Sequence, residues 1–177
     1  SANDAAVALA IHHAGSEEEF AKVMNRRAKQ LGLYSANFVN ATGLDVFPKL
    51  EDATLPENDP RRQIRGNVMS ASDVMFLARR LLAYDFVRET VKQDHFYGTS
   101  VDEGFFHEKE STNQLLGTFL NIEGMKTGYT QLAGECLVTL GKTADGNEIL
   151  TVILGSSDRF GESKKLISWI YDSFEWR

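Results

Sequence analysis

Apolar and polar positions along the chain first predict two helices in its N-terminal part. Residues 5–11 form an apolar run that ends shortly before Gly15. Because this run is apolar on nearly every side, it is typical of a buried helix. Ser16, followed three residues later by Glu19, indicates a capping box at the start of a second helix. The core stripe predicted for that helix, before a C-cap at Gly32, is Phe20, Val23, Met24, Arg27, Ala28 and Leu31.

The pattern weakens in the middle of the chain and then returns. Residues 34–45 are polar with little periodicity, which indicates a short strand or a loop. Residues 46–69 contain all three prolines and a charge-rich stretch, and we interpret them as a surface insertion rather than a linker between domains. A third helix is predicted to begin at Ser72 and Asp73. Its core stripe is Val74, Leu77, Ala78, Leu81 and Leu82.

The C-terminal half predicts an antiparallel sheet followed by a helix. Residues 95–125 are expected to form short strands and turns, and two strong strand runs follow at 135–142 and 148–154. Asp145 and Gly146 between these runs are a hairpin signal. A last helix, spaced to pack on a sheet, is predicted by Leu166, Ile167, Ile170, Tyr171 and Phe174. The whole order predicts one α+β domain over residues 1–177, with helices packed on an antiparallel sheet.

Composition narrows the class of protein. With 177 residues, 42% hydrophobic and 25% charged, the chain is typical of a globular domain. A formal charge of −6 argues against a nucleic-acid-binding surface, which needs clustered basic residues. No signal-peptide pattern is visible at the start, and no apolar run approaches the roughly 20 residues of a membrane span.

Cysteine and histidine give no sign of a metal or redox site. The one cysteine, Cys136, can form no disulfide within the chain, and its apolar surroundings are typical of a buried strand residue rather than a reactive thiol. His12 and His13 are adjacent and therefore diverge on a helix, while His95 and His107 lie in unrelated segments. We therefore expect neither a metal nor a cofactor.

Two short elements suggest a particular chemistry. Lys126-Thr127-Gly128, at the edge of the strand group, would offer a cation, a hydroxyl and backbone N–H groups to a peptide that ends in a carboxylate. The glycine would allow close approach of that peptide. Lys-Thr-Gly is one of three elements, with Ser-x-x-Lys and a Ser-Asp-Asn element, found in active-site serine penicillin-binding proteins and class A β-lactamases. Ser1-Ala2-Asn3, before the first helix, matches the pattern Ser-x-Asn. The alternative is that these three residues are the remnant of an expression tag.

Further landmarks occur in the same order as in a known family and cover nearly the whole chain. The sequence resembles the low-molecular-mass penicillin-binding proteins, the serine-type, peptidase S11-like D-alanyl-D-alanine carboxypeptidases. The resemblance implies a β-lactamase/transpeptidase-like fold. The landmarks besides the two short elements are residues 14–18, Phe20, Met24-Asn25, Ala28, Leu31-Gly32, Asn37-Phe38, residues 42–45, residues 70–82, residues 112–116, residues 123–130, Ala133-Gly134 and residues 163–166.

One element of the family is not found in this chain. None of its serines is followed three residues later by a lysine, so there is no Ser-x-x-Lys, the element that supplies the nucleophile and its base. In the family this element precedes Ser-x-Asn. We therefore expect the N-terminal part of the domain to be missing, and the chain alone to be inactive. The missing segment of the same protein would be its partner and would cover the apolar helix at residues 5–11.

The resemblance assigns catalytic roles to Ser1, Asn3 and Lys126. Ser1 would pass a proton to the leaving amine. Asn3 would hydrogen-bond the substrate amide and orient the missing base. Lys126 would supply positive potential that attracts the substrate carboxylate.

The resemblance also assigns substrate-binding roles to the strand group and to one arginine. Thr127 would contact the carboxylate beside Lys126 and Gly128, and the backbone N–H of Tyr129 would donate to the oxyanion. Arg159 is a candidate second carboxylate ligand, and a solvated arginine before a helix is the alternative. Some relatives carry Arg at the position of Thr112, so a role of that Arg in the site is in doubt here.

The implied activity is removal of the terminal D-alanine from peptidoglycan stem peptides, with β-lactam antibiotics as inhibitors that acylate the enzyme. The family implies an exported protein of the bacterial cell envelope. One alternative is a β-lactamase of the same superfamily, but no deacylating Glu with the spacing Glu-x-x-x-Asn is found between the two elements. The other is a non-catalytic binding module that retains the fold.

Overall fold

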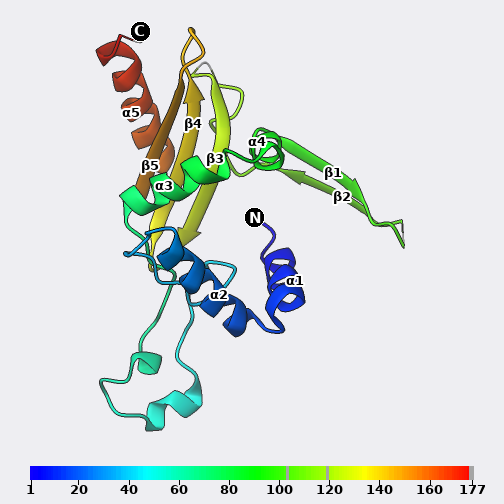
Figure 1. Cartoon of the computed structure of the whole chain (residues 1–177), viewed down its shortest axis with the longest axis vertical. Coiled ribbons are helices and arrows are strands. Elements are labelled where there is room, and N and C mark those ends of the chain that lie inside the picture. The colour runs from blue at the N-terminus through cyan, green and yellow to red at the C-terminus, as the bar shows by residue number, and fades with distance from the viewer. Residues whose placement is uncertain (103, 119, 176–177) are drawn as a thin grey trace. The chain divides into compact units, whose positions relative to one another are not determined.

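The structure is a computed structural model that describes residues 1–102, 104–118 and 120–175. It divides into two compact units, and each is described by itself. The first unit contains Ser1–Asp73 together with Thr130–Ala133. The second contains Val74–Tyr129 and Gly134–Arg177. Figure 1 shows the elements of both units along the chain.

The first unit begins with two helices that pack on each other, α1 (Asn3–Ala14) and α2 (Glu17–Gln30). Gly15 ends α1 in the left-handed conformation at φ 82°. The Ser16 hydroxyl accepts a hydrogen bond from the backbone N–H of Glu19, so half of the predicted capping box is present. Both helices were predicted, but α1 buries only Ala10 within this chain. Leu9 and Ile11 are exposed, so α1 presents an exposed apolar patch, as expected for this helix without a covering segment.

The segment after α2 is held by asparagine side chains rather than by strand pairing. Asn25 on α2 donates to the carbonyl of Phe38 at 2.7 Å and accepts from its N–H at 2.8 Å. Asn67 accepts from the N–H of Val39 at 2.8 Å and donates to the carbonyl of Asn40. Backbone pairing is limited to single bridges, such as Asn37 with Val68. This explains why residues 34–45 show no hydrophobic period.

Residues 46–69 contain two short 3₁₀ helices, η1 (Leu50–Thr54) and η2 (Pro60–Arg62). None of the residues in these two helices is buried. The segment begins and ends on one antiparallel bridge, between Val46 and Arg65. Exposure and the short closing bridge are what a surface insertion requires, and the interpretation of this segment as an insertion stays a prediction.

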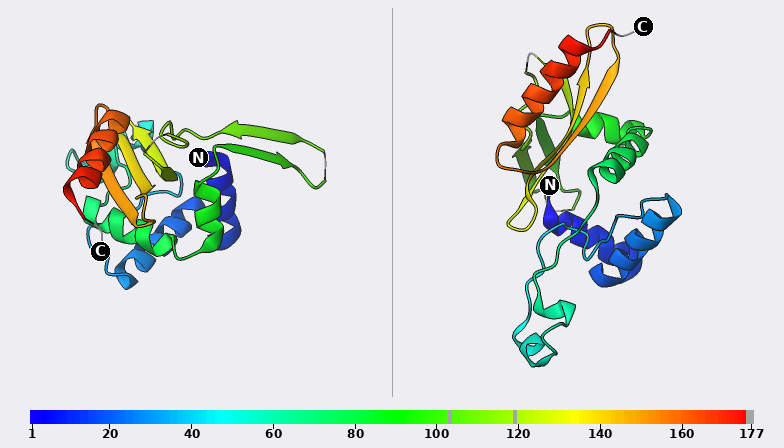
Figure 2. Two further views of the ribbon diagram at one scale, coloured as in Figure 1. Left: turned by 90° about the horizontal axis from the view of Figure 1, so that it is seen from above. Right: turned by 90° about the vertical axis from the view of Figure 1, so that its left-hand side faces the viewer.

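The second unit contains a three-stranded antiparallel sheet in the order β3–β4–β5, formed by β3 (Ile122–Thr130), β4 (Gly134–Lys142) and β5 (Glu148–Ser156). β4 and β5 form the predicted hairpin, and its turn is closed by hydrogen bonds between Thr143 and Asn147. The predicted C-terminal helix is α5 (Arg159–Ser173), which packs on β4 and β5. Figure 2 shows α5 lying along the sheet.

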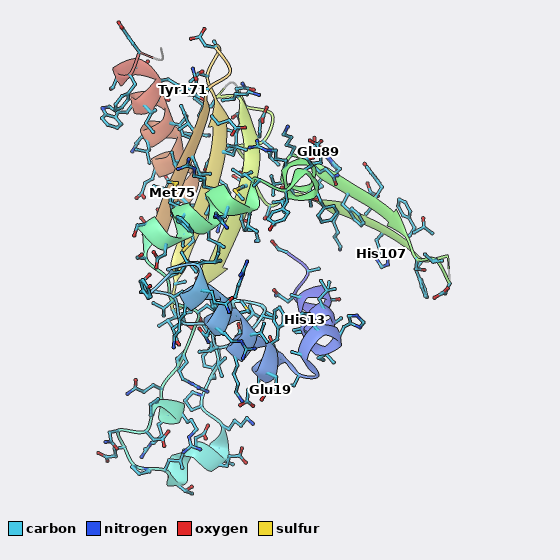
Figure 3. The ribbon with its side chains drawn as sticks, in the orientation of Figure 1. His13, Glu19, Met75, Glu89, His107 and Tyr171 are labelled. Carbon is cyan, nitrogen blue, oxygen red and sulfur yellow. The ribbon has the colours of Figure 1, made fainter. Side chains whose placement is uncertain are left out.

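The apolar core of this unit lies between α5 and the sheet. Ile167 of α5 and Leu137 of β4 are both almost fully buried. Tyr171, labelled in Figure 3, packs on the same cluster, and its hydroxyl lies within hydrogen-bond distance of the carbonyls of Leu120 and Lys142. The other buried members of the cluster are Leu115, Leu120 and Ile122.

Three smaller parts complete the second unit. Of α3 (Ala71–Leu81), which begins in the first unit, Ala78 is buried, as its predicted stripe requires. The next helix, α4 (Asp85–Val91), was not predicted. It is joined to the sheet by a paired interaction between the Arg88 guanidinium and the Glu148 carboxylate. An exposed hairpin follows, formed by β1 (His95–Thr99) and β2 (Phe106–Glu110). These are two of the short strands that the sequence predicts for this region.

The α+β class with an antiparallel sheet covered by a helix is thus confirmed. No helix in the described part of the chain has the length and apolar character needed to cross a membrane.

Candidate active site

Lys126-Thr127-Gly128 lies on β3, an outer strand of the sheet. β3 is paired with β4 along one edge, and within the described residues no other strand is paired with its second edge. Thr127 is buried, while its neighbours Lys126 and Gly128 are exposed, as expected from the alternation of a strand. The predicted placement of this motif on an edge strand is therefore what the structure shows.

The Thr127 hydroxyl meets a second hydroxyl. The Oγ1 atoms of Thr127 and Thr112 are 2.5 Å apart, and either could be the donor. Thr112 lies in the turn between β2 and β3. The sequence drew attention to Thr112 as part of the landmark at residues 112–116 and as a position where some relatives carry Arg. No spacing rule connects residues 112 and 127 before the fold is known.

Lys126 lies in a positive environment. Loss of solvent around its ammonium group lowers the pKa of Lys126 from 10.5, and the positive charge of Arg159 lowers this pKa further. Its Nζ donates to the carbonyl of Thr127 at 2.5 Å. A bound anion would relieve the repulsion between the two cations, so the site favours a negatively charged ligand.

Arg159 reaches the motif from the first turn of α5. Its Nη1 donates to the carbonyl of Gly128 at 2.8 Å, and its guanidinium lies over the ring of Phe160 at 4.9 Å. The backbone N–H of Arg159 donates to the carboxylate of Glu135 on β4 at 3.0 Å. The Nε atom is buried and has no hydrogen-bond partner among the described residues. Arg159 is thus fixed against the motif strand rather than extended into solvent.

Gly128 is not required by packing within this chain. A methyl group added at its Cα would have one close neighbour, the Cβ of Cys136 on β4 at 3.8 Å, which is an ordinary contact distance. Gly124 on the same strand is different, because an added methyl group there would lie 2.9 Å from a side-chain carbon of Val91. A glycine at position 124 is explained by the fold, whereas a glycine at position 128 leaves an open surface beside Lys126 and Tyr129.

The predicted residues Ser1 and Asn3 lie in the first unit, whereas Tyr129 lies on β3 in the second unit. Asn3 is the first residue of α1 and Ser1 precedes it, so the predicted placement of Ser-x-Asn at a helix start is confirmed. Both residues are exposed. The structure therefore brings Lys126, Thr127, Gly128 and Arg159 together within one unit, while Ser1 and Asn3 belong to the first.

No group of three or more His, Cys, Asp or Glu side chains in the described part of the chain is arranged to hold a metal ion. Cys136 lies on β4 as predicted and is half-buried.

Comparison with known proteins places these features in a family. The family model of D-alanyl-D-alanine carboxypeptidases, Peptidase S11, matches residues 1–158. The chain belongs to this family. The resemblance seen in the sequence is thereby confirmed, and hydrolases of this family act on the bacterial cell wall.

Relatives of the S11 family are similar over nearly the full chain. The D-alanyl-D-alanine carboxypeptidases DacF of Bacillus subtilis and DacC of Escherichia coli are 32% and 34% identical over 99% of this chain. The chain covers 41% and 39% of these two relatives, which is well under half of their length.

Solved structures confirm the fold of this S11 chain. Penicillin-binding protein D2 of Listeria monocytogenes in its cefotaxime-bound form has a TM-score of 0.73 at 31% identity, over 94% of this chain and 60% of that one. PBP3 of Streptococcus pneumoniae, described as a peptidoglycan synthesis regulatory factor, has a TM-score of 0.79 at 31% identity, over 100% of this chain and 54% of that one.

Proposed function

We propose that this chain is part of a serine D-alanyl-D-alanine carboxypeptidase that removes the terminal D-alanine from peptidoglycan stem peptides through an acyl-enzyme. The single observation that supports this most strongly is the arrangement on β3. Lys126, Thr127 and Gly128 lie on an outer strand, and Arg159 is hydrogen-bonded to the same strand at Gly128. Membership of the S11 family supports the proposal that this arrangement binds a peptide that ends in a carboxylate.

The substrate carboxylate is the group that this site is suited to bind. Burial of its ammonium group and, to a smaller extent, the positive charge of Arg159 lower the pKa of Lys126, and a carboxylate between the two cations would offset their repulsion. Thr127 would add a hydroxyl donor, and a hydrogen bond to a charged acceptor is stronger than one between neutral groups. The carboxylate would thus fix the end of the peptide beside β3.

The exposed end of the motif would hold the reacting carbonyl. We assign one oxyanion donor to the backbone N–H of Tyr129, which follows the open position at Gly128. Donors held by a strand are preorganised, so they stabilise the developing negative charge without reorganising during the reaction.

Ser1 and Asn3 would act with a nucleophile that this chain does not contain. No serine here is followed three residues later by a lysine, so the nucleophile and its base would come from a segment that precedes Ser1 in the complete protein. Ser1 would transfer a proton to the leaving D-alanine, and Asn3 would hold the substrate amide. We propose that the 177-residue chain alone is inactive and that the complete protein is acylated by β-lactams.

Incubation with a fluorescent penicillin tests this proposal. The complete protein should be labelled stoichiometrically and should release D-alanine from a stem peptide, whereas the 177-residue chain should show no adduct by intact mass. A stoichiometric adduct on the chain alone would contradict the need for a preceding nucleophile. Rapid release of the penicillin by the complete protein would favour a β-lactamase instead. Failure of the complete protein to react would favour a binding module.

A substitution at Gly128 tests the site itself. G128A in the complete protein should lower acylation by about tenfold or more, since a misplacement near 1 Å costs up to about a hundredfold in rate. Its melting temperature should stay close to that of the unmodified protein, because the added methyl group has room beside Cys136.

A peptidoglycan substrate would also require export to the cell envelope. Fractionation of cells that express the complete protein can check this location.

A further inference from the structure

The hydroxyl pair formed by Thr112 and Thr127 has no explanation in packing alone. Thr127 is only 8% exposed, and Thr112 approaches it from a turn 15 residues earlier in the chain. A hydroxyl has one proton to donate and two lone pairs that accept. At an Oγ1 to Oγ1 distance of 2.5 Å, one of the two threonines must donate its proton to the other.

The turn that carries Thr112 is fixed on both sides. Before it, the N–H of Ser111 donates to the carbonyl of Asp94 at 2.6 Å. After it, the side chain of Asn113 accepts from the N–H of Leu115 at 3.1 Å. Leu115 is fully buried in the core formed with Leu137 and Ile167. The backbone of Thr112 is therefore held in place by the core of its own unit.

Proton counting then decides the direction of the hydrogen bond when a carboxylate is bound. A carboxylate only accepts, so Thr127 must donate its single proton to it. Thr127 can then only accept from Thr112, which must donate. A hydroxyl that accepts a hydrogen bond is also polarised into a better donor.

We propose that Thr112 is a positioning residue that donates to Thr127 and thereby directs the Thr127 proton toward a bound carboxylate. This inference rests on the proposed function, because it takes the ligand at Thr127 to be the substrate carboxylate. The inference makes Thr112 a residue that helps the site to select a peptide ending in a carboxylate over one with an uncharged end. An amide at that end could donate to Thr127, so the direction of the Thr112 hydrogen bond would then matter less.

The experiment compares T112V with T112S in the complete protein. Valine keeps the shape of threonine and removes the hydroxyl, while serine keeps the hydroxyl. The probes are N-acetyl-D-alanyl-D-alanine and its C-terminal amide, and their affinities are measured by calorimetric titration. We expect T112V to weaken binding of the carboxylate by up to about tenfold, the size of one net hydrogen bond between uncharged groups. Binding of the amide should change less than about twofold, and T112S should restore the carboxylate affinity.

Melting temperatures of all three proteins should agree within a few degrees. Equal losses for both probes, or no loss for either, would overturn the inference. Failure of the unmodified protein to bind the carboxylate probe would overturn it together with the carboxylate site. If the unmodified protein shows the expected binding pattern but releases no D-alanine from the acid probe, the inference stands and the proposed hydrolysis is wrong.

Discussion

The two units of the chain are stabilised in different ways. In the second unit, α5 covers a three-stranded sheet, and apolar side chains such as Leu137 and Ile167 fill the space between them. In the first unit, the long segment after α2 is held by amide side chains such as Asn25 and Asn67. The second unit depends mainly on burial of apolar surface, whereas the segment after α2 in the first unit depends on hydrogen bonds from amide side chains to unpaired backbone.

This difference explains why the candidate site lies where it does. A strand that belongs to a sheet covered by a packed helix holds Lys126 and Thr127 in fixed positions, which recognition of a carboxylate requires. Loops held by a few amides can change their length at low cost, which suits a surface insertion such as residues 46–69. Four substitutions test the contrast.

The largest expected effect is in the apolar core. L137A should lower the free energy of unfolding by about 3 kcal/mol, because it leaves a cavity between β4 and α5. L154A on β5, where the leucine is 41% exposed, is the matched control and should cost about 1 kcal/mol or less. Urea unfolding measures both. Similar losses for the two variants would show that the core is not formed as described.

The second substitution addresses the amide-held unit. N25A removes the two hydrogen bonds to the backbone of Phe38, and we expect a loss of about 2 kcal/mol. N58A, at an exposed position in the insertion, should change the free energy of unfolding by less than about 0.5 kcal/mol. Hydrogen exchange should become faster at residues 37–40 in N25A and stay unchanged in β4. Equal acceleration in both units would argue against separate means of stabilisation.

The third substitution lies in the sheet and, unlike L137A, should raise the free energy of unfolding. The Thr139 hydroxyl is fully buried and has no hydrogen-bond partner among the described residues. T139V should therefore stabilise the protein by about 1 kcal/mol. T118V is the contrast, because the Thr118 hydroxyl donates to the carbonyl of Leu115 at 2.7 Å and its loss should destabilise. A destabilised T139V in thermal melting would show that the hydroxyl has a partner.

The smallest effect concerns the ion pair that joins α4 to the sheet. The hydrogen bonds from Arg88, and then its charge, lower the pKa of Glu148 from 4.5. The ionised carboxylate therefore stabilises the fold above that value, and this contribution is lost as the pH falls through the lowered pKa. Because Glu148 is 40% exposed, solvent screening limits the cost of E148Q at pH 7 to about 0.5 kcal/mol.

The comparison for this pair is E89Q, at the neighbouring and more exposed Glu89 that Figure 3 labels on α4. E89Q should leave the free energy of unfolding in urea unchanged within error at pH 7 and at acidic pH. The difference between E148Q and the unmodified protein should disappear as the pH falls through the lowered pKa of Glu148. A difference that persists below that pKa would mean that the glutamate acts through packing rather than charge.

The sequence predicted the parts of the fold that depend on local signals. Ser16 fixed the start of α2, Asp145-Gly146 indicated the β4–β5 hairpin, and the stripe through Ile167 identified α5 as a sheet-packing helix. Lys-Thr-Gly was likewise visible as a short motif. These signals act over a few residues, so one sequence is enough to recognise them.

The parts that were not predicted depend on contacts between distant residues. α4 is short and is joined to β5 by Arg88 and Glu148, which are 60 residues apart. Thr112 meets Thr127 only because the turn after β2 is anchored in the core. The exposure of α1 was expected only from the family resemblance, because periodicity shows that a helix is apolar but not what covers it.

The open position at Gly128 is also a suitable place for an engineered disulfide that could control ligand binding. The Cβ that residue 128 would gain by substitution lies 3.8 Å from the Cβ of Cys136, which is the usual Cβ separation of two disulfide-bonded cysteines. G128C should therefore form a cross-strand disulfide under mild oxidation, visible as a loss of about 2 Da in intact mass, one hydrogen from each thiol. Reduction would reopen the strand, so that binding at Lys126 could be controlled by a thiol reagent. Two thiols that stay reduced under oxidation would show that the strands lie farther apart.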